Sequence, residues 1–375
     1  MKKMKVVTRF GSLDMLRGVA ALLVVWQHSS ETLVKLPTIQ KNGTFLADIA
    51  STLDFGRIGV ICFFLISGFV VPYSLGMKAK LGTKRKFIIR RFFRLFPAYW
   101  FSILVALVVG YLFQINYGFN NVLSNLTMLQ SFLGQAHMQG IYWTLQVELV
   151  FYILCIVLYN LGVLQNTKTI FCIIIFLFFL FTFSQIATRF IFDIPITSGA
   201  SILKEFMLMP YLIAIMFLGT LMRQAYDSKT PNKEQILFTL IATVICFGLP
   251  FFLLLTSLIG LDLIQDSMRF GASHCLALTL FLLGLFFNKE VPKAFTWLGV
   301  ISYSIYLFHP FIISGLMVVL KSNQIAFMHN LHLSLYMSII FILTILVSSY
   351  IYLYVEMPAM KLGKNISEQK ELILT

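Results

Sequence analysis

The stretch from Ser12 to Glu31 most constrains this chain, because it places ionisable side chains within an apolar run long enough to cross a membrane. Its sequence is S-L-D-M-L-R-G-V-A-A-L-L-V-V-W-Q-H-S-S-E. Arg17 and His28 are eleven positions apart, which is roughly 16 Å along a helix and about half of a hydrocarbon core. Since an ionisable side chain at membrane depth is costly and usually functional, we expect other helices to bring further groups to these two.

The composition predicts a multi-pass membrane protein. Of the 375 residues, 59% are hydrophobic and 12% are charged, whereas a soluble domain carries about 25% charged residues. The formal net charge is +14, which in a soluble protein would suggest a nucleic-acid partner. Here the positive residues gather on one side of the membrane, so we expect contact with lipids and none with nucleic acid.

Apolar segments near the length of a membrane-spanning helix recur along the whole chain. We therefore predict an all-α integral membrane protein with about ten transmembrane helices in one bundle, forming a single domain over residues 1–375. The expected spans are 12–31, 56–76, 95–114, 141–164, 168–187, 206–222, 235–258, 270–287, 295–320 and 332–356. The cysteines fall inside apolar runs, which predicts small core side chains; they are Cys62, Cys155, Cys172, Cys246 and Cys275.

Lys and Arg are distributed unevenly between the two sides of these spans. With the N-terminus inside, the inner segments hold 22 of the 29 Lys and Arg residues, and loop 115–140 has no charged residue. This asymmetry predicts that both termini are cytoplasmic. The N-terminal M-K-K-M-K resembles the start of a signal peptide, but no small-residue cleavage site follows, so we expect an uncleaved first span.

The basic segment after the second span reads K-A-K-L-G-T-K-R-K-F-I-I-R-R-F-F-R-L-F-P. Arg91 and Arg94 are three residues apart and would share one face of a helix. One interpretation is an interfacial helix that holds anionic lipid and sets the topology. The other is a cytoplasmic site for a phosphorylated ligand, since guanidinium groups match phosphate oxygens. The two interpretations are compatible.

Three ionisable residues from different spans are expected at a similar depth. His28 would lie roughly 22–24 Å from the inner face, counted along the first span. Glu148 lies in the fourth span, about seven residues from its outer edge, and would lie roughly 20 Å from the inner face. His309 in the ninth span would lie roughly 21 Å from it. A histidine near a carboxylate is the usual arrangement for taking a proton from a hydroxyl, because the carboxylate orients the ring and stabilises its charged form.

Each of these residues also has a purely structural interpretation. His309 could hydrogen-bond backbone that Pro310 leaves free, and Glu148 could pair with a structural arginine. The small pair Ser67-Gly68 favours close helix packing.

The charged groups near the ends of the first two spans suggest no metal site. Arg57 is expected to extend its guanidinium to the outer membrane surface. His28 and Glu31 form an H-x-x-E, which is not the H-E-x-x-H zinc signature, so we expect no metal site.

Five segments in order resemble the membrane acyltransferase-3 family, the bacterial sugar O-acyltransferases. They are S-L-D-M-L-R-G-V-A-A-L-L-V-V-W-Q-H, F-F-L-I-S-G-F-V-V-P, R-R-F-F-R-L-F-P-A-Y-W, Y-W-T-L-Q-V-E-L-V-F-Y and I-S-Y-S-I-Y-L-F-H-P. The resemblance covers nearly the whole chain. It departs at Ile61, where many members have an acidic residue, so a role for that acid does not carry over. Many members carry an esterase-like domain after the spans, whereas this sequence continues for about 19 residues past Glu356. We therefore expect transfer directly to the acceptor or to a separate partner.

The resemblance implies a bacterial inner-membrane enzyme that moves an acyl group, usually acetyl, from cytoplasmic acyl-CoA to a hydroxyl of an extracytoplasmic or lipid-linked glycan. The family's Arg-ten-residues-His motif falls on Arg17 and His28. Its Arg-x-x-Arg motif falls on Arg91 and Arg94, and its Trp-Ser/Thr-Leu…Glu motif on positions 143–145 and 148.

We therefore expect an O-acetyltransferase that uses acyl-CoA as co-substrate and holds no bound cofactor. His28 and Glu148 are the expected catalytic residues, and Arg17, Arg91 and Arg94 are expected to bind the acyl-CoA phosphates. A transient acyl-histidine is a variant of this mechanism. The residues expected to support the site are Asp14, Trp143, Tyr303 and His309.

Two other functions stay open at this point. A transporter or flippase of a glycan or small anionic metabolite also places ionisable residues at the midplane, although the sequence shows no internal repeat. A membrane scaffold that only binds a biosynthetic partner would leave His28 and Glu148 unexplained.

Overall fold

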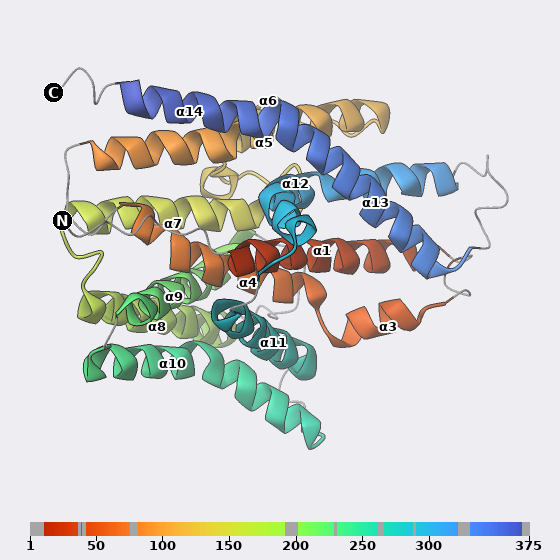
Figure 1. Ribbon diagram of the computed structural model, residues 1–375. Coiled ribbons are helices and arrows are strands. Elements are labelled where there is room, and N and C mark those ends of the chain that lie inside the picture. The colour runs from red at the N-terminus through yellow and green to blue at the C-terminus, as the bar shows by residue number, and fades with distance from the viewer. Residues whose placement is uncertain are drawn as a thin grey trace.

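The protein is a bundle of long helices that lie side by side (Figure 1). The computed structural model describes residues 11–36, 39, 43–75, 82–191, 202–228, 231–261, 266–287, 290–321 and 331–369. Within these residues the regular elements are all helices, which confirms the predicted all-α class. Several residues that the orientation argument counts lie outside this part of the chain, namely Lys2, Lys3, Lys5, Arg9, Lys78, Lys80, Lys229, Lys289 and Lys370.

The described residues in the first half of the chain form eight helical elements. They are α1 (Gly11–Leu33), α3 (Phe45–Thr52), α4 (Phe55–Val70), η1 (Pro72–Leu75), α5 (Thr83–Leu112), α6 (Phe119–Leu126), η2 (Gln130–Leu133) and α7 (Tyr142–Asn160). The second half contains α8 (Thr167–Ile191), α9 (Ile202–Asp227), α10 (Lys233–Leu258), α11 (Ser267–Phe286), α12 (Lys293–Lys321), α13 (Leu333–Ile351), the π-helical turn η4 (Tyr352–Glu356) and α14 (Met357–Gln369).

Nine segments of the described chain are long and apolar enough to cross a membrane. They begin with α4 and end with the continuous segment from α13 to α14. The first predicted span, 12–31, forms α1, which is helical as expected but is not among the nine. The polar groups at its two ends, including Asp14, Arg17 and Glu31, lower its mean hydropathy. A helix of this composition needs partners for its polar side chains inside the protein.

Two helices extend beyond the spans predicted for them, which were ended at charged residues. The third span was expected to begin at residue 95, but α5 begins at Thr83, so the basic segment forms its first turns. Arg, Lys, Phe and Leu are all compatible with the interior of a helix, and a charged side chain does not by itself end a helix. The last span was expected to end at residue 356, but the helix continues through η4 and α14 to Gln369.

Helix α1 lies in the middle of the bundle and packs against α12 and α4 (Figure 1). Glycines allow these helices to approach closely, as at other membrane helix interfaces. A Cβ on Gly299 would lie 1.9 Å from the Asp14 carbonyl oxygen, and one on Gly59 would lie 2.4 Å from the Ala20 carbonyl oxygen. Helices α4 and α9 meet in the same way, since a Cβ on Gly68 would lie 1.7 Å from the Met216 carbonyl oxygen.

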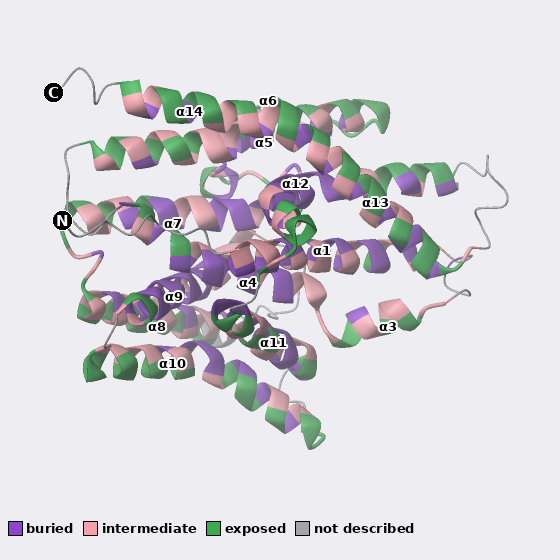
Figure 2. Ribbon diagram, viewed as in Figure 1, coloured by how far each residue is buried: buried purple, intermediate pink, exposed green. Residues whose placement is uncertain are grey.

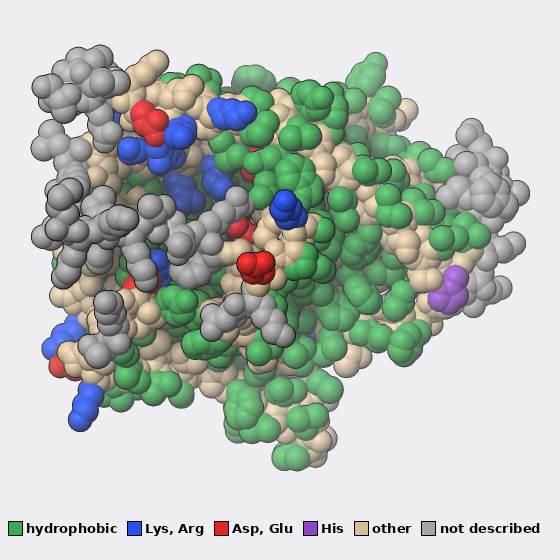
Figure 3. Space-filling model, in the orientation of Figure 1, with side chains coloured by type: hydrophobic (Ala, Val, Ile, Leu, Met, Phe, Trp, Pro, Cys, Tyr) green, Lys and Arg blue, Asp and Glu red, His purple; other side chains and the backbone are tan. Residues whose placement is uncertain are grey.

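Burial decreases from the centre of the bundle to its surface (Figure 2). Most of the apolar stretch of α9 is buried, whereas α8 and α10 leave large apolar side chains exposed, such as Phe179 and Val244. Figure 3 shows apolar side chains over much of the visible face. These exposed apolar surfaces fit contact with lipid tails.

The segment before α7 folds back into the bundle. Asn125, Gln130 and Ser131 are buried there, and the Ser131 backbone N–H donates to Gln146 Oε1 at 3.1 Å. As a result α7 begins near the middle of the bundle's length instead of at its edge (Figure 1). This start sets the depth of every residue on α7.

The start of α1 and the end of α14 point toward the same end of the bundle (Figure 1). Lys and Arg side chains gather toward that end over α5 and α14 (Figure 3). The exposed ones include Lys84, Arg85, Arg90, Lys361 and Lys364. This arrangement fits the orientation expected from the sequence, and the placement of that end in the cytoplasm stays a prediction.

The close approach of α12 to α1 gives a test of the packing. We expect Gly299→Ala to lower the unfolding free energy by roughly 1–3 kcal/mol, because its methyl group would push against backbone that cannot rotate away. The matched control is Gly315→Ala on the same helix, where a Cβ would meet no atom within 4 Å. Thermal unfolding in detergent measures both variants. Equal midpoints for the two would contradict the close α1–α12 contact.

Candidate functional site

Two neighbouring cavities lie inside the bundle. The larger, about 400 Å³, is lined by His28 and is called the His28 chamber. The smaller, about 50 Å³, is lined by Arg17 and Glu148 and is called the Arg17 chamber. Val60 of α4 and Tyr306 of α12 line both. The two groups that the sequence places on one helix, Arg17 and His28, therefore face adjacent cavities.

In the described chain, His28 and His309 stack with ring centroids 5.3 Å apart and planes 17° from parallel. This contact confirms that α1 and α12 bring the two histidines to one depth. The His309 ring is fully buried, and its Nδ1 donates to the Ile305 carbonyl oxygen at 3.2 Å. Because Pro310 frees the Tyr306 carbonyl instead, the structural interpretation of His309 stays a prediction, and the Nδ1 bond only fixes the ring. It leaves Nε2 as an acceptor, and Nε2 has no hydrogen-bond partner within the described residues.

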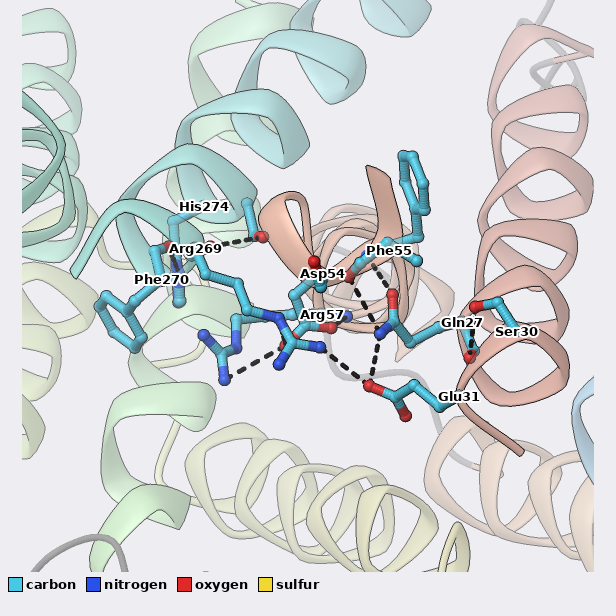
Figure 4. Close-up of polar contacts among 12 residues, drawn as sticks. Gln27, Ser30, Glu31, Asp54, Phe55, Arg57, Arg269, Phe270 and His274 are labelled. Carbon is cyan, nitrogen blue, oxygen red and sulfur yellow. Dashed lines mark hydrogen bonds and ion pairs between the residues drawn. The ribbon is translucent and has the colours of Figure 1, made fainter. Parts of the chain in front are cut away.

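Four charged side chains form a rim network around the His28 chamber, from the ends of α1, α4 and α11 (Figure 4). Arg269 pairs with Glu31 at 2.9 Å and lies 3.9 Å from an Asp54 oxygen. Asp54 also pairs with Arg57 at 3.3 Å and caps the start of α4 by accepting the Arg57 backbone N–H. Arg57 was expected to reach the membrane surface, but its guanidinium stacks over the Phe270 ring instead.

Gln27 ties the rim network to the backbone around it. Its Nε2 donates to Glu31 Oε1 at 2.6 Å and to the Ala50 carbonyl oxygen at 3.2 Å. Its Oε1 accepts the Phe55 backbone N–H at 2.9 Å (Figure 4). One buried amide thus fixes the end of α1 against α3 and α4, which holds Glu31 and Asp54 near His28.

Glu148 lies in the Arg17 chamber and not beside His28. Its Oε1 accepts hydrogen bonds from Ser67 Oγ at 3.2 Å and from the Tyr152 hydroxyl. The acids whose charges act on His28 are Glu31 and Asp54. The predicted depth of Glu148 is therefore wrong, because α7 begins inside the bundle and carries Glu148 further toward the Arg17 side.

The three predicted phosphate-binding arginines converge around Tyr152. Arg91 donates to the Tyr152 hydroxyl at 3.5 Å and to Ser74 Oγ at 3.2 Å, and its guanidinium stacks over the Tyr152 ring. Arg94 and Arg17 both interact electrostatically with Tyr152 and Glu148. The structure therefore brings together Arg17, Arg91 and Arg94, as the sequence predicted.

The predicted supporting residues divide between the two chambers. Trp143 lines the His28 chamber, with His309 behind His28. Tyr303 lines the Arg17 chamber and donates its hydroxyl to the Leu95 carbonyl oxygen at 2.9 Å. Asp14 interacts electrostatically with Arg17 and Arg94.

The sequence analysis missed several residues of these chambers. Ser67 was assigned to helix packing, but it is Gly68 that makes the close contact, while Ser67 bonds Glu148. Asp54 and Arg269 lie at helix ends, where charge is common and gives no signal. Within the described residues no group of three His, Cys, Asp or Glu side chains could hold a metal ion.

The bundle and its buried polar chambers define a multi-pass membrane protein with a site inside its spanning region. Comparison with known families matches residues 10–353 to the acyltransferase-3 family, described as "Acyltransferase domain". The chain belongs to this family.

One curated relative is "Nodulation protein 10" of Rhizobium leguminosarum bv. viciae, which is 31% identical over 163 residues. The match covers 38% of this chain and 42% of the relative's length. No solved structure matches the chain.

Thiol labelling tests which side each end of the bundle faces. Cys62, Cys155 and Cys246 are buried as predicted, but Cys172 is exposed because it lies on the outer side of α8. In a Cys172→Ser, Cys275→Ser background, we expect a membrane-impermeant maleimide to label Glu31→Cys in spheroplasts, because the rim network would face outward.

The matched control is Lys364→Cys on α14, which we expect to react only in inverted vesicles. The reverse pattern, with Lys364→Cys labelled in spheroplasts and Glu31→Cys in inverted vesicles, would overturn the predicted orientation.

Proposed function

We propose that this protein is an O-acyltransferase that moves an acetyl group from cytoplasmic acetyl-CoA to a hydroxyl of a cell-surface or lipid-linked glycan. The observation that carries the proposal is the pair of adjacent chambers, one with Arg17 of the arginine cluster at its wall and one with a histidine at its wall. Donor and acceptor would enter from opposite sides and meet near Val60 and Tyr306. The proposed location is the bacterial inner membrane.

The donor side of this proposal rests on the arginines. Arg91 and Arg94 lie on the first turns of α5, next to the exposed basic residues of that helix. Guanidinium groups bind phosphate oxygens through paired hydrogen bonds, and CoA carries several phosphates. Arg17 lies deeper, at the wall of the Arg17 chamber, where it would contact the donor between its phosphates and its thioester. That long arm would span the roughly 16 Å between Arg17 and His28.

The size of the Arg17 chamber supports a short acyl group. A cavity of about 50 Å³ has room for roughly four water-sized groups, at about 10–15 Å³ each. An acetyl thioester has a comparable number of heavy atoms at its reactive end. The apolar walls at Phe63, Phe64 and Leu145 would contact a longer chain.

The acceptor side rests on the His28 chamber. Its volume of about 400 Å³ falls within the range of small-ligand sites. In the proposed reaction, His28 takes the proton of an acceptor hydroxyl as its oxygen attacks the thioester carbon. A new ester forms, the carbon–sulfur bond breaks, and CoA leaves as its thiol after receiving that proton. Glu31 and Asp54 would stabilise the charged imidazole, and His309 would hold its ring.

Tyr306 separates the two chambers in this structure. Its hydroxyl shares a hydrogen bond with Thr144 Oγ1 at 2.7 Å and donates to the Ile141 carbonyl oxygen at 3.2 Å. Glu148 lies on the donor side of the proposed site. It accepts hydrogen bonds from Ser67 and Tyr152 and lines the same chamber as Arg17. Its role is therefore to hold the donor end of the site.

We expect His28→Ala to abolish acetyl transfer, with a loss of roughly two to four orders of magnitude for a missing general base. The assay follows thioester loss and label transfer from radiolabelled acetyl-CoA to a cell-envelope glycan extract, with protein in lipid. The control is His332→Asn, since His332 only caps α13 through Ser334 and asparagine keeps a cap acceptor. Near-normal transfer by folded His28→Ala would remove the proposed role, and no turnover with any acyl-CoA would favour a transporter.

We expect the Arg91→Ala, Arg94→Ala double variant to raise the KM for acetyl-CoA by roughly tenfold or more, because charge-assisted hydrogen bonds to phosphate would be lost. The matched control is Arg90→Ala, since Arg90 pairs with Glu368 on the exposed side of the same helix turns. Steady-state kinetics at varied acetyl-CoA distinguishes the two. An unchanged KM in the double variant would exclude these arginines from the donor site.

A further inference from the structure

Glu356 is a buried carboxylate to which neither the family's motifs nor the proposed mechanism gives a role. It closes the π-helical turn η4, only 1% of its surface is exposed, and it lies three residues beyond the part of the chain that matches the family. Pro358 follows two residues later. Because proline lacks an N–H and crowds the carbonyl four residues before it, it favours a widened turn here. The turn directs Glu356 into the bundle.

The surroundings of Glu356 connect it to the arginine cluster. Ser304 Oγ donates to its Oε2 at 2.9 Å, whereas Oε1 has no hydrogen-bond partner within the described chain. Its charge attracts Arg94 most strongly and Arg17 as well. Arg94 and Arg17 repel each other, since both are cations in one low-dielectric region.

Counting the charges around Tyr152 shows what Glu356 adds. Three guanidinium groups gather there, from Arg17, Arg91 and Arg94. The carboxylates that act on the cluster are Asp14, Glu148 and Glu356. The cluster is thus close to neutral overall, and Glu356 is the carboxylate that acts most strongly on Arg94. A buried cation without such a partner would be strongly destabilising.

Glu356 is not needed to join α5 to α14, because other contacts already hold these two helices together. Arg90 and Glu368 already join α5 to α14 at the protein surface, with a 2.8 Å ion pair and a 3.2 Å bond from Arg90 to Ser367. Gly363 of α14 also lies directly against the Phe93 side chain. The contact between the two helices is therefore made outside the chamber, so its formation does not explain a buried acid beside Arg94.

We propose that Glu356 is a positioning residue that holds Arg94 and Arg17 in place and neutralises one of their charges until an anionic donor arrives. This inference rests on the proposed acetyl-CoA site and deepens it. Glu356 touches no substrate in this account. It acts through the arginines, by attracting their charges and by competing electrostatically with the anionic groups of the donor for them.

The proposal predicts a split between KM and kcat. Glu356→Gln keeps the shape of the side chain but removes its charge, which leaves the cluster with one more net positive charge. We expect the KM for acetyl-CoA to fall by roughly three- to tenfold, because an anion then meets less competition. We expect kcat to fall as well, since Arg94 loses the partner that fixes its position. The matched control is Glu368→Gln, which should change neither constant.

A double-variant cycle tests the counter-ion assignment without any activity. Glu356→Gln and Arg94→Gln are each expected to lower the unfolding midpoint of the full-length protein in detergent, because each leaves a buried charge unpaired. The double variant should lose less than the sum of the two single losses. Additive losses would overturn the assignment, and so would a raised or unchanged KM for acetyl-CoA in folded Glu356→Gln.

The two proposals fail in different ways. If the wild-type protein does not use acetyl-CoA, the proposed function is lost, and the unfolding cycle alone then decides whether Glu356 holds Arg94. If the wild-type protein transfers acetyl groups but the cycle is additive, the function stands and the role of Glu356 is lost.

Discussion

The cost of placing charge inside a membrane is the constraint on which this structure depends. Helix α1 carries Arg17 at one level and His28 at another, so the bundle must supply partners at both. Around Arg17 it supplies Asp14 and Glu148, and around His28 it supplies the rim network and the His309 ring. Asp14 and Glu31 lie on α1 itself, and the other partners come from helices far apart from it in the sequence. The separation of the two levels along α1 produces two chambers instead of one.

Close packing around α1 makes these partners available. Gly299 and Gly59 allow α12 and α4 to reach its backbone, and these helices carry His309, Ser67 and Tyr306. Dispersion contacts at such interfaces replace the hydrophobic driving force that lipid removes. The more lipid-exposed helices, α8 and α10, contribute no lining residue to either chamber within the described chain. The functional part of the bundle is its most buried part.

The sequence predicts the helical class, most spans and the main site residues, because hydropathy and buried charge leave few alternatives. It correctly brings together His28 with His309, and Arg17 with Arg91 and Arg94. It misplaces Glu148, since no local pattern shows that the segment before α7 folds inward. It gives no role to Ser67 or Glu356. A serine next to a glycine suggests a helix-packing contact, and an acidic residue near the end of a span suggests a solvent-exposed side chain. Only the tertiary arrangement shows that these two side chains face the arginines.

The central claim is that a cytoplasmic donor and an extracytoplasmic acceptor meet inside one bundle. The most direct test uses proteoliposomes in which the protein has a known orientation, with radiolabelled acetyl-CoA only on the side of α14 and a cell-envelope glycan extract only on the side of the rim network. The account predicts labelled glycan on the side opposite the acetyl-CoA, with release of CoA on the donor side. Transfer that occurs only when donor and acceptor share one side would contradict it.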